Sequence, residues 1–252
     1  MTDGFLEIQR LGMSFRDNKS HLEVLRDISF SLGQEEFLCV LGPSGSGKST
    51  LLRLIAGLLK PTEGQVNFGD WACQPRVGLV FQYANLMPWR TVRQNIALPL
   101  ELQQTPAAEI AKRVDEMIEL VGLEEFSHNW PSELSGGMAQ RVAIARAFIQ
   151  EPDLLLLDEP FGALDALTRE RMGAELLNIW QGRRIPVVMV THSISEALLL
   201  SDRVLVFTQR PGQITHDVAV TFARPRTEEL RYSATFQQLE RELRGSLREK
   251  IN

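Results

Sequence analysis

A glycine-rich loop, Gly-Pro-Ser-Gly-Ser-Gly-Lys-Ser-Thr at residues 42–50, constrains the fold of this chain more than any other feature. An apolar run, 37–41, precedes the loop, and a helix-forming segment, 51–56, follows it. This order predicts a strand, a loop and a helix, in which backbone N–H groups and the helix N-terminus bind a polyphosphate. The alternative is a glycine turn that merely joins a strand to a helix.

The residues after the glycines supply a charge and a metal ligand. In a loop of this pattern, Lys48 contacts the β- and γ-phosphates and the Ser49 hydroxyl suits Mg²⁺. The spacing from Gly42 to Lys48 and Ser49 therefore predicts a nucleotide site. Its predicted phosphate-binding residues are Gly42, Pro43, Ser44, Gly45, Ser46, Gly47, Lys48, Ser49 and Thr50.

Composition limits the remaining possibilities. The chain has 252 residues, 44% of them hydrophobic, which suits one large α/β domain with an inserted subdomain. Its net charge of −5 gives no basic field, so nucleic acid is not an expected partner. We expect a water-soluble, cytosolic chain, because residues 1–10 lack the pattern of a secretory leader and no stretch approaches the roughly 18 apolar residues of a membrane span. Cys39 and Cys73 have no metal-site spacing and are interpreted as free thiols.

Hydropathy patterns predict an α/β fold with an N-terminal antiparallel β subdomain and an inserted helical subdomain. Predicted strands are 6–11 and 28–32, which alternate, then 65–68, 77–81, 154–157, 186–190 and 204–207. The continuous apolar character of 154–157 and 186–190 indicates parallel strands covered on both faces. Helical periodicity from 95 to about 122 indicates a helical subdomain inserted at roughly 83–150. The predicted domains are 1–221 and a short helical tail, 222–252, with Leu239, Leu243 and Leu247 at amphipathic spacing.

Two carboxylates follow the apolar run 154–157, at the end of a strand where open α/β sheets bind their ligands. Asp158 fits a Mg²⁺ site, acting through a water. Glu159 fits the general base that polarises an attacking water. The alternative is a surface turn with helix-capping acids, which is less consistent with a phosphate loop that needs a metal partner.

Other candidate residues have equally plausible structural explanations. Gln82 suits Mg²⁺ and the attacking water, but it also suits a simple loop. His192, after the strand at 186–190, is placed to donate to a γ-phosphate, although a histidine there is more often structural. Asp165 is equally well explained as a helix cap, and Phe15 stacks on adenine or fills the core of the first sheet.

A second glycine-containing helix start lies at Leu134-Ser135-Gly136-Gly137-Met138, before a strongly helix-forming segment. It is another candidate phosphate site. One ATP already has its binding loop at 42–50, so this second site is redundant unless it serves a nucleotide held by another subunit.

Together these motifs resemble those of the ATP-binding-cassette (ABC) ATPases, which have a P-loop NTPase (RecA-like) core. The resemblance runs from about residue 6 to 207 and rests on 42–50, Gln82, 134–138, 157–160, 163–165 and His192. It implies a head-to-tail dimer with a second copy of the chain, or with a homologous ATPase subunit, around two ATP molecules with Mg²⁺. In this dimer Ser135 and Gly137, with Gly136 between them, contact the partner's ATP. It also implies that Asp165 communicates across the dimer and that Phe15 stacks on adenine. Met138 departs from the usual glutamine of this motif.

Within that family, residues 81–92 resemble the corresponding loop of bacterial importers for nitrate, sulfonate, taurine and related solutes. The resemblance implies a peripheral subunit on the cytoplasmic face of the membrane, with a solute-binding protein as an indirect partner. It also implies that a permease docks near Met87, Pro88 and Trp89, an apolar cluster typical of partner surfaces. The alternative is a loop tucked onto its own subdomain.

Other classes of ATPase fit less well. A DNA-repair or chromosome-structure ATPase needs a long heptad insertion, which this chain lacks. A translation-associated cassette protein has two cassettes and basic contacts, and a small-molecule kinase does not explain 134–138. The sequence therefore favours the ATPase subunit of an importer for a small anionic solute, without identifying that solute.

Overall fold

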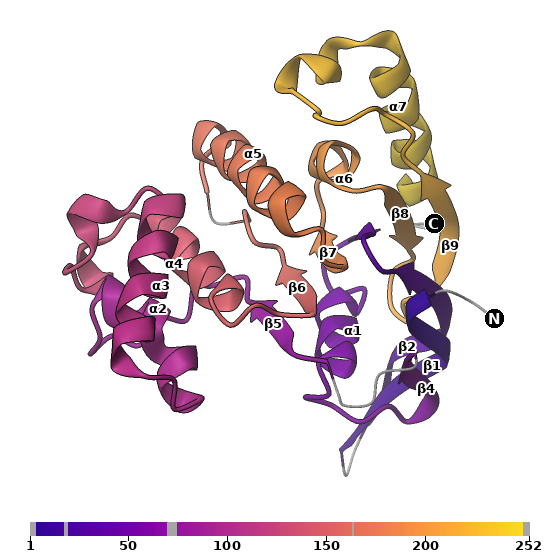
Figure 1. Cartoon of the computed structure of the whole chain (residues 1–252). Helices are drawn as coiled ribbons and strands as arrows, with labels where there is room; N and C mark the ends of the chain where they lie inside the picture. Colours follow the sequence, from indigo (N-terminus) through magenta and orange to yellow (C-terminus); the bar gives the residue numbers. More distant parts are fainter. Residues whose placement is uncertain (1–3, 18–19, 70–74, 163, 249–252) are drawn as a thin grey trace.

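The computed structural model describes residues 4–17, 20–69, 75–162 and 164–248, which form two β-sheets with helices around them (Figure 1). Cys39 is buried and is a free thiol, as the sequence predicts. Cys73 and Ala163 lie outside the described residues.

The smaller sheet is antiparallel and has the strand order β2–β1–β4. Its strands are β1 (Gly4–Asp17), β2 (Ser20–Gly33) and β4 (Glu63–Phe68). Leu6 and Ile8 of β1 are buried and Glu7 between them is exposed, the alternation expected where one face of a strand meets a core. The predicted antiparallel β subdomain is therefore confirmed.

The larger sheet has the strand order β5–β6–β7–β3–β8–β9. Its strands are β3 (Phe37–Leu41), β5 (Val77–Val80), β6 (Leu154–Asp158), β7 (Val187–Thr191), β8 (Arg203–Phe207) and β9 (Ile214–Ala219). All pairings are parallel except that of β8 with β9. Every residue of β3, β6 and β7 is buried, which confirms the predicted strands covered on both faces. The sequence analysis missed β9, an edge strand whose residues are partly or fully exposed.

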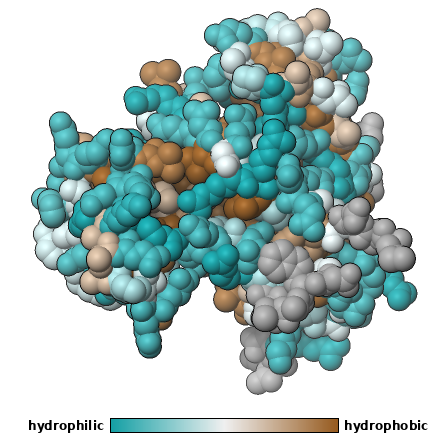
Figure 2. Space-filling view, viewed as in Figure 1, coloured by the Kyte–Doolittle hydropathy of each residue, from teal (hydrophilic) through white to brown (hydrophobic). Residues whose placement is uncertain are grey.

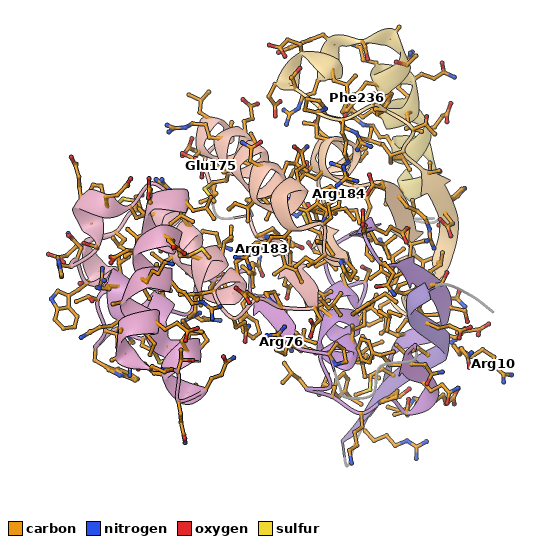
Figure 3. All side chains as sticks on the ribbon, viewed as in Figure 1. Arg10, Arg76, Glu175, Arg183, Arg184 and Phe236 are labelled. Carbon is orange, nitrogen blue, oxygen red and sulfur yellow. The ribbon has the colours of Figure 1, made fainter. Side chains whose placement is uncertain are left out.

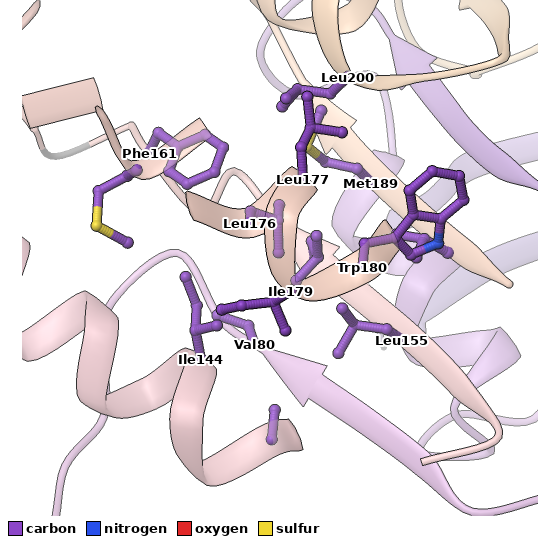
Figure 4. Packing of buried hydrophobic residues seen from close by; sticks show 14 of the residues in the cluster. Val80, Ile144, Leu155, Phe161, Leu176, Leu177, Ile179, Trp180, Met189 and Leu200 are labelled. Carbon is purple, nitrogen blue, oxygen red and sulfur yellow. The ribbon is translucent and has the colours of Figure 1, made fainter. Parts of the chain in front are cut away.

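The two faces of the larger sheet belong to different cores. Leu38 and Val40 pack with the smaller sheet and with α1 (Lys48–Ile55), whereas Phe37, Cys39 and Leu41 pack with the helices of the opposite face. On that opposite face, Leu176, Leu177, Ile179 and Trp180 of α5 (Ala166–Arg183) pack with residues from β5, β6, β7 and α4 (Gly136–Phe148) (Figure 4). The parallel strands are thus fixed from both sides.

The inserted helices lie to one side of the sheets (Figure 1). They are α2 (Val92–Leu102), α3 (Ala107–Leu120) and α4, with short 3₁₀ turns at Glu124–Phe126 and Pro131–Glu133. Thr91 and Gln94 form a capping box that begins α2. Arg183, at the end of α5, donates to the carbonyl of Phe148 at the end of α4, which ties this unit to α5 (Figure 3). The boundaries 83–150 remain a prediction.

The C-terminal segment packs on α6 (Ile194–Leu200) and β8. It consists of a 3₁₀ turn, Glu228–Tyr232, and α7 (Ala234–Arg248), the helix that the leucine spacing predicts. Phe236 is fully buried and stacks on Phe222, with ring centroids 5.7 Å apart (Figure 3). The division into 1–221 and 222–252 also stays a prediction. Among the described residues, no helix combines the length and apolarity that crossing a membrane requires.

Candidate functional site

The loop between β3 and α1 has a backbone that requires glycine. Gly45 and Gly47 have φ angles of 79° and 93°, in the left-handed region. A Cβ on Gly47 would lie 2.7 Å from Leu25 Cδ2, and a Cβ on Gly42 would lie 2.9 Å from Phe207 Cβ. Larger residues at these positions would displace the loop from its position before α1.

Lys48 begins α1 and turns its side chain back over the loop. Its Nζ donates to the carbonyls of Gly42 and Pro43, both at 2.9 Å, and only 4% of the side chain is exposed. Burial lowers the pKa of Lys48, while nearby Glu159 and Asp158 act in the opposite direction. The buried hydroxyl of Ser46 has no hydrogen-bond partner among the described residues. A cation and an unpaired donor in one glycine loop fit a bound polyphosphate.

Ser49 and Asp158 meet across the end of the sheet. Ser49 Oγ donates to Asp158 Oδ1 at 2.8 Å, and Asp158 is the last residue of β6. Burial raises the pKa of Asp158. A hydroxyl and a carboxylate are oxygen ligands of the type that Mg²⁺ prefers, usually together with substrate phosphates. The described residues contain no cluster of three or more His, Cys, Asp and Glu side chains that would hold a metal without such phosphates.

Glu159 and His192 face each other at the ends of neighbouring strands. Their side chains are 2.9 Å apart, measured from His192 Nδ1 to Glu159 Oε2, and Glu159 Oε1 lies 3.8 Å from Lys48 Nζ. Because a carboxylate only accepts, Nδ1 donates in the first contact. Glu159 has a φ of 44°, and its N–H donates to the carbonyl of Val190 on β7. The fold thus brings Lys48, Ser49, Asp158, Glu159 and His192 together, although they come from separate segments.

Gln82 and residues 135–137 make no hydrogen bond or ion pair with this cluster in the described part of the chain. Gln82 is exposed, just after β5. Ser135 caps α4 by accepting from Met138 N, and Ser135 and Gly136 are exposed, while Gly137 is buried. Helix α4 packs on α2, α5 and β5, whereas α1, after the glycine loop, packs on β6 and β7.

The structure tests the helix-cap interpretation of Asp165 and the core interpretation of Phe15. Asp165 caps α5, its Oδ1 accepting from Thr168 N at 3.0 Å. Hydrogen bonding to the side chain of Thr168, and then to its backbone, lowers the pKa of Asp165. The capping interpretation is confirmed, and a role across a dimer stays a prediction. Phe15 is 43% exposed on β1, so its interpretation as a core residue is wrong. Stacking on adenine remains a prediction.

A buried polar cluster next to His192 was missed by the sequence analysis. Glu196 Oε2 accepts from Thr191 Oγ1 at 2.7 Å, and Arg169 Nε lies 3.6 Å from Glu196 Oε1. Burial raises the pKa of Glu196, while the hydrogen bond from Thr191 and the charge of Arg169 lower it. The sequence pattern that could have indicated this cluster is a single carboxylate, Glu196, in a short segment that is otherwise almost entirely apolar.

Comparison with known proteins agrees with this geometry. The family model described as ABC transporter matches residues 25–162. The nitrate import ATP-binding protein NrtD of Synechococcus elongatus is 45% identical over 232 residues, 90% of this chain and 85% of that protein. The taurine import ATP-binding protein TauB of Roseobacter denitrificans is 44% identical over 222 residues, 86% of this chain and 83% of that protein.

Solved structures show the same architecture. The dimeric structure of the bacterial ABC transporter cassette MJ0796 has a TM-score of 0.77 and 32% identity, covering 86% of this chain and 100% of that chain. The same cassette in a post-hydrolysis state bound to ADP and Pi has a TM-score of 0.76 and 31% identity, with the same coverage. The predicted P-loop NTPase core is thereby confirmed. From its sequence, its fold and these relatives, the chain belongs to the ABC transporter family and is an ATP-binding, ATP-hydrolysing cassette.

Proposed function

We propose that this chain is the ATPase subunit of an importer for a small anionic solute such as nitrate, a sulfonate or taurine. It would work on the cytoplasmic face of the cell membrane, bound to a permease that receives its solute from a solute-binding protein. The observation that carries the ATPase part is the convergence of Lys48, Ser49, Asp158 and Glu159 at one end of the larger sheet. The solute class rests on relatives described as nitrate, taurine and aliphatic sulfonate import proteins.

Each clustered side chain then has a chemical role. The backbone of 42–50 and the Lys48 ammonium bind the phosphates, with Phe15 against the adenine. Ser49, Asp158 and Gln82 would hold Mg²⁺, which neutralises charge on the phosphate oxygens. Glu159 accepts a proton from the attacking water, and His192 holds that carboxylate through the Nδ1 contact.

Dimerisation would complete this site. Ser135 and Gly136 are exposed at the N-terminus of α4, where they are accessible to a second subunit, whereas Asp165 is held at the N-terminus of α5. A helix N-terminus favours an anion. We infer that Ser135, Gly136 and Gly137 bind the γ-phosphate of ATP held by the partner, with Asp165 at the dimer contact. The dimeric arrangement of the related cassette supports this inference.

The permease would dock on the segment from Gln82 to Arg90. Arg146 of α4 donates to the carbonyls of Ala84 and Asn85, and the buried Asn95 pairs with both backbone groups of Met87. Side chains of α4 and α2 therefore fix the backbone of this segment. Trp89 is nevertheless 69% exposed, which argues against a loop tucked onto its own subdomain. Figure 2 shows further hydrophobic surface between the helical subdomain and α5, as interaction sites commonly have.

Replacing Trp89 tests this docking surface. We expect Trp89→Ala to weaken co-purification with the cognate permease and to reduce solute uptake in vesicles, because aromatic anchors of interfaces cost roughly 2 kcal/mol or more when truncated. Basal ATPase activity and the circular dichroism spectrum should stay unchanged, since Trp89 is exposed and lies outside the nucleotide cluster.

Tyr232 provides the matched control. It is an aromatic residue that is 81% exposed on the C-terminal 3₁₀ turn, so Tyr232→Ala should leave both assembly and uptake intact. Normal assembly and uptake by Trp89→Ala would contradict the docking role. Loss of the folded state would mean instead that Trp89 supports the helical subdomain.

A further inference from the structure

Glu196 is a buried carboxylate that holds the segment on which His192 lies. Its side chain is 10% exposed, and its Oε2 accepts the proton of Thr191 Oγ1 at 2.7 Å. The same Thr191 oxygen accepts from the backbone N–H of Ser193 at 3.0 Å. Because Thr191 and Ser193 are the chain neighbours of His192, one hydroxyl fixes the backbone on both sides of the histidine.

Arg169 extends this contact to the loop before Asp165. Its Nη2 donates to the carbonyl of Leu164 at 2.9 Å. Its Nε, 3.6 Å from Glu196 Oε1, is buried and has no hydrogen bond within the described residues. At that separation the contact is an ion pair, too long for a hydrogen bond. Arg169 therefore joins α6 to the residue that precedes Asp165.

The connections form a closed ring. Glu159 contacts His192 at 2.9 Å, and the carbonyl of Glu159 accepts from Gly162 N–H. Leu164 N–H in turn donates to the carbonyl of Phe161, the chain neighbour of Gly162. From Leu164 the ring continues through Arg169, Glu196 and Thr191 back to His192. The residues proposed to handle the attacking water thus share one network with the loop proposed to face a second subunit.

Stability alone gives little reason for such a network. Burying the Glu196 carboxylate and the Nε of Arg169, whose side chain is otherwise 35% exposed, costs desolvation free energy. Replacing a buried ion pair with apolar residues is often neutral or stabilising. Helix α6 is otherwise almost entirely apolar and would pack well without Glu196. The ion pair and the Thr191 hydrogen bond instead fix how the side chains that they join are oriented, because each contact forms only between particular atoms.

We propose that Glu196 and Arg169 are positioning residues for ATP hydrolysis, which through Thr191 and Leu164 hold His192 against Glu159 and tie that geometry to the loop bearing Asp165. This inference rests on the proposed function, which assigns the roles of Glu159, His192 and Asp165. In the described part of the chain, neither Glu196 nor Arg169 has a hydrogen bond or ion pair to Lys48, Ser49, Asp158 or Glu159.

The test compares kcat with KM for ATP in Thr191→Val, Glu196→Gln and Arg169→Met. We expect kcat to fall about 10- to 100-fold in each, as for other residues that orient catalytic groups, with KM for ATP unchanged. Thr191→Ser keeps the hydroxyl, so its kcat should stay close to that of the unchanged protein. The double variant Glu196→Gln with Arg169→Met should lose no more than the worse single variant, because both changes open the same ring.

Ser201→Ala separates positioning from folding. The Ser201 hydroxyl is buried at the opposite end of α6 and donates to the carbonyl of Ala197, outside the ring. Thermal unfolding should show a loss of stability in Ser201→Ala with kcat kept. An unchanged kcat in Thr191→Val, or an equal loss in Ser201→Ala, would overturn the positioning role.

Glu159→Gln distinguishes this failure from failure of the proposed function. If Glu159→Gln is inactive while Thr191→Val keeps full turnover, only the positioning role of Glu196 and Arg169 is contradicted. If Glu159→Gln itself keeps full turnover, the proposed assignment of the site is wrong, and the positioning role falls with it.

Discussion

Replacing Lys48 with alanine should reduce ATP hydrolysis at least about 10³-fold, the upper range for removing one preorganised donor from a site where charge develops. Lys48 is almost fully buried beneath the glycine loop, and its ammonium is held by carbonyls of that loop and faces Glu159. No mobile cation from solvent can take its place with the same geometry. Phosphate release by the purified variant measures the effect.

Lys60→Ala is the control for this change, because Lys60 is an exposed lysine after α1 and should leave turnover intact. Circular dichroism should show both variants folded. Near-normal phosphate release by Lys48→Ala would contradict the assignment of the nucleotide site to residues 42–50.

Glu159→Gln should lower hydrolysis by about 10²- to 10⁴-fold, the usual contribution of a positioned general base, and leave ATP binding largely intact. The amide keeps the shape of the side chain but cannot accept a proton from water. Both Glu159 oxygens face cations or donors, Lys48 at 3.8 Å and His192 at 2.9 Å, so the carboxylate is oriented before substrate binds. Equilibrium binding of ATP and phosphate release, measured side by side, separate the two effects.

Glu175→Gln is the matched control, a glutamate on α5 that lies outside the cluster (Figure 3). It should keep both binding and turnover. A Glu159→Gln variant that no longer binds ATP would show that Glu159 has a role other than that of a base.

The sequence predicted those parts of the site whose residues lie next to one another along the chain. Residues 42–50 could be interpreted because strand, glycine loop and helix are contiguous, so Lys48 and Ser49 are placed by chain geometry alone. The acids at 158 and 159 followed from a buried strand that ends in polar residues. Their meeting with His192 required the order of the strands, since β6 and β7 are neighbours in register, with Asp158 opposite Val190.

The parts that sequence did not predict depend on distant contacts or weak patterns. Strand β9 has polar, partly exposed residues because it lies at an edge, and its pairing with β8 defines it more than its own hydropathy. The role of Glu196 is invisible in the sequence, because its partners Thr191 and Arg169 come from other elements. Phe15 could not be assigned before its exposure on β1 was known.

The central claim is that two copies of this chain complete each other's ATP site through Ser135, Gly136 and Gly137. Light scattering of Glu159→Gln tests it most directly, because blocked hydrolysis should trap the ATP-bound state and ligand shared between subunits stabilises the dimer. We predict the mass of one chain without nucleotide and twice that mass with ATP and Mg²⁺. Adding Ser135→Arg should return the protein to the mass of one chain, with its unfolding temperature unchanged. A dimer that forms equally well with Ser135→Arg, or no dimer in either protein, would contradict the claim.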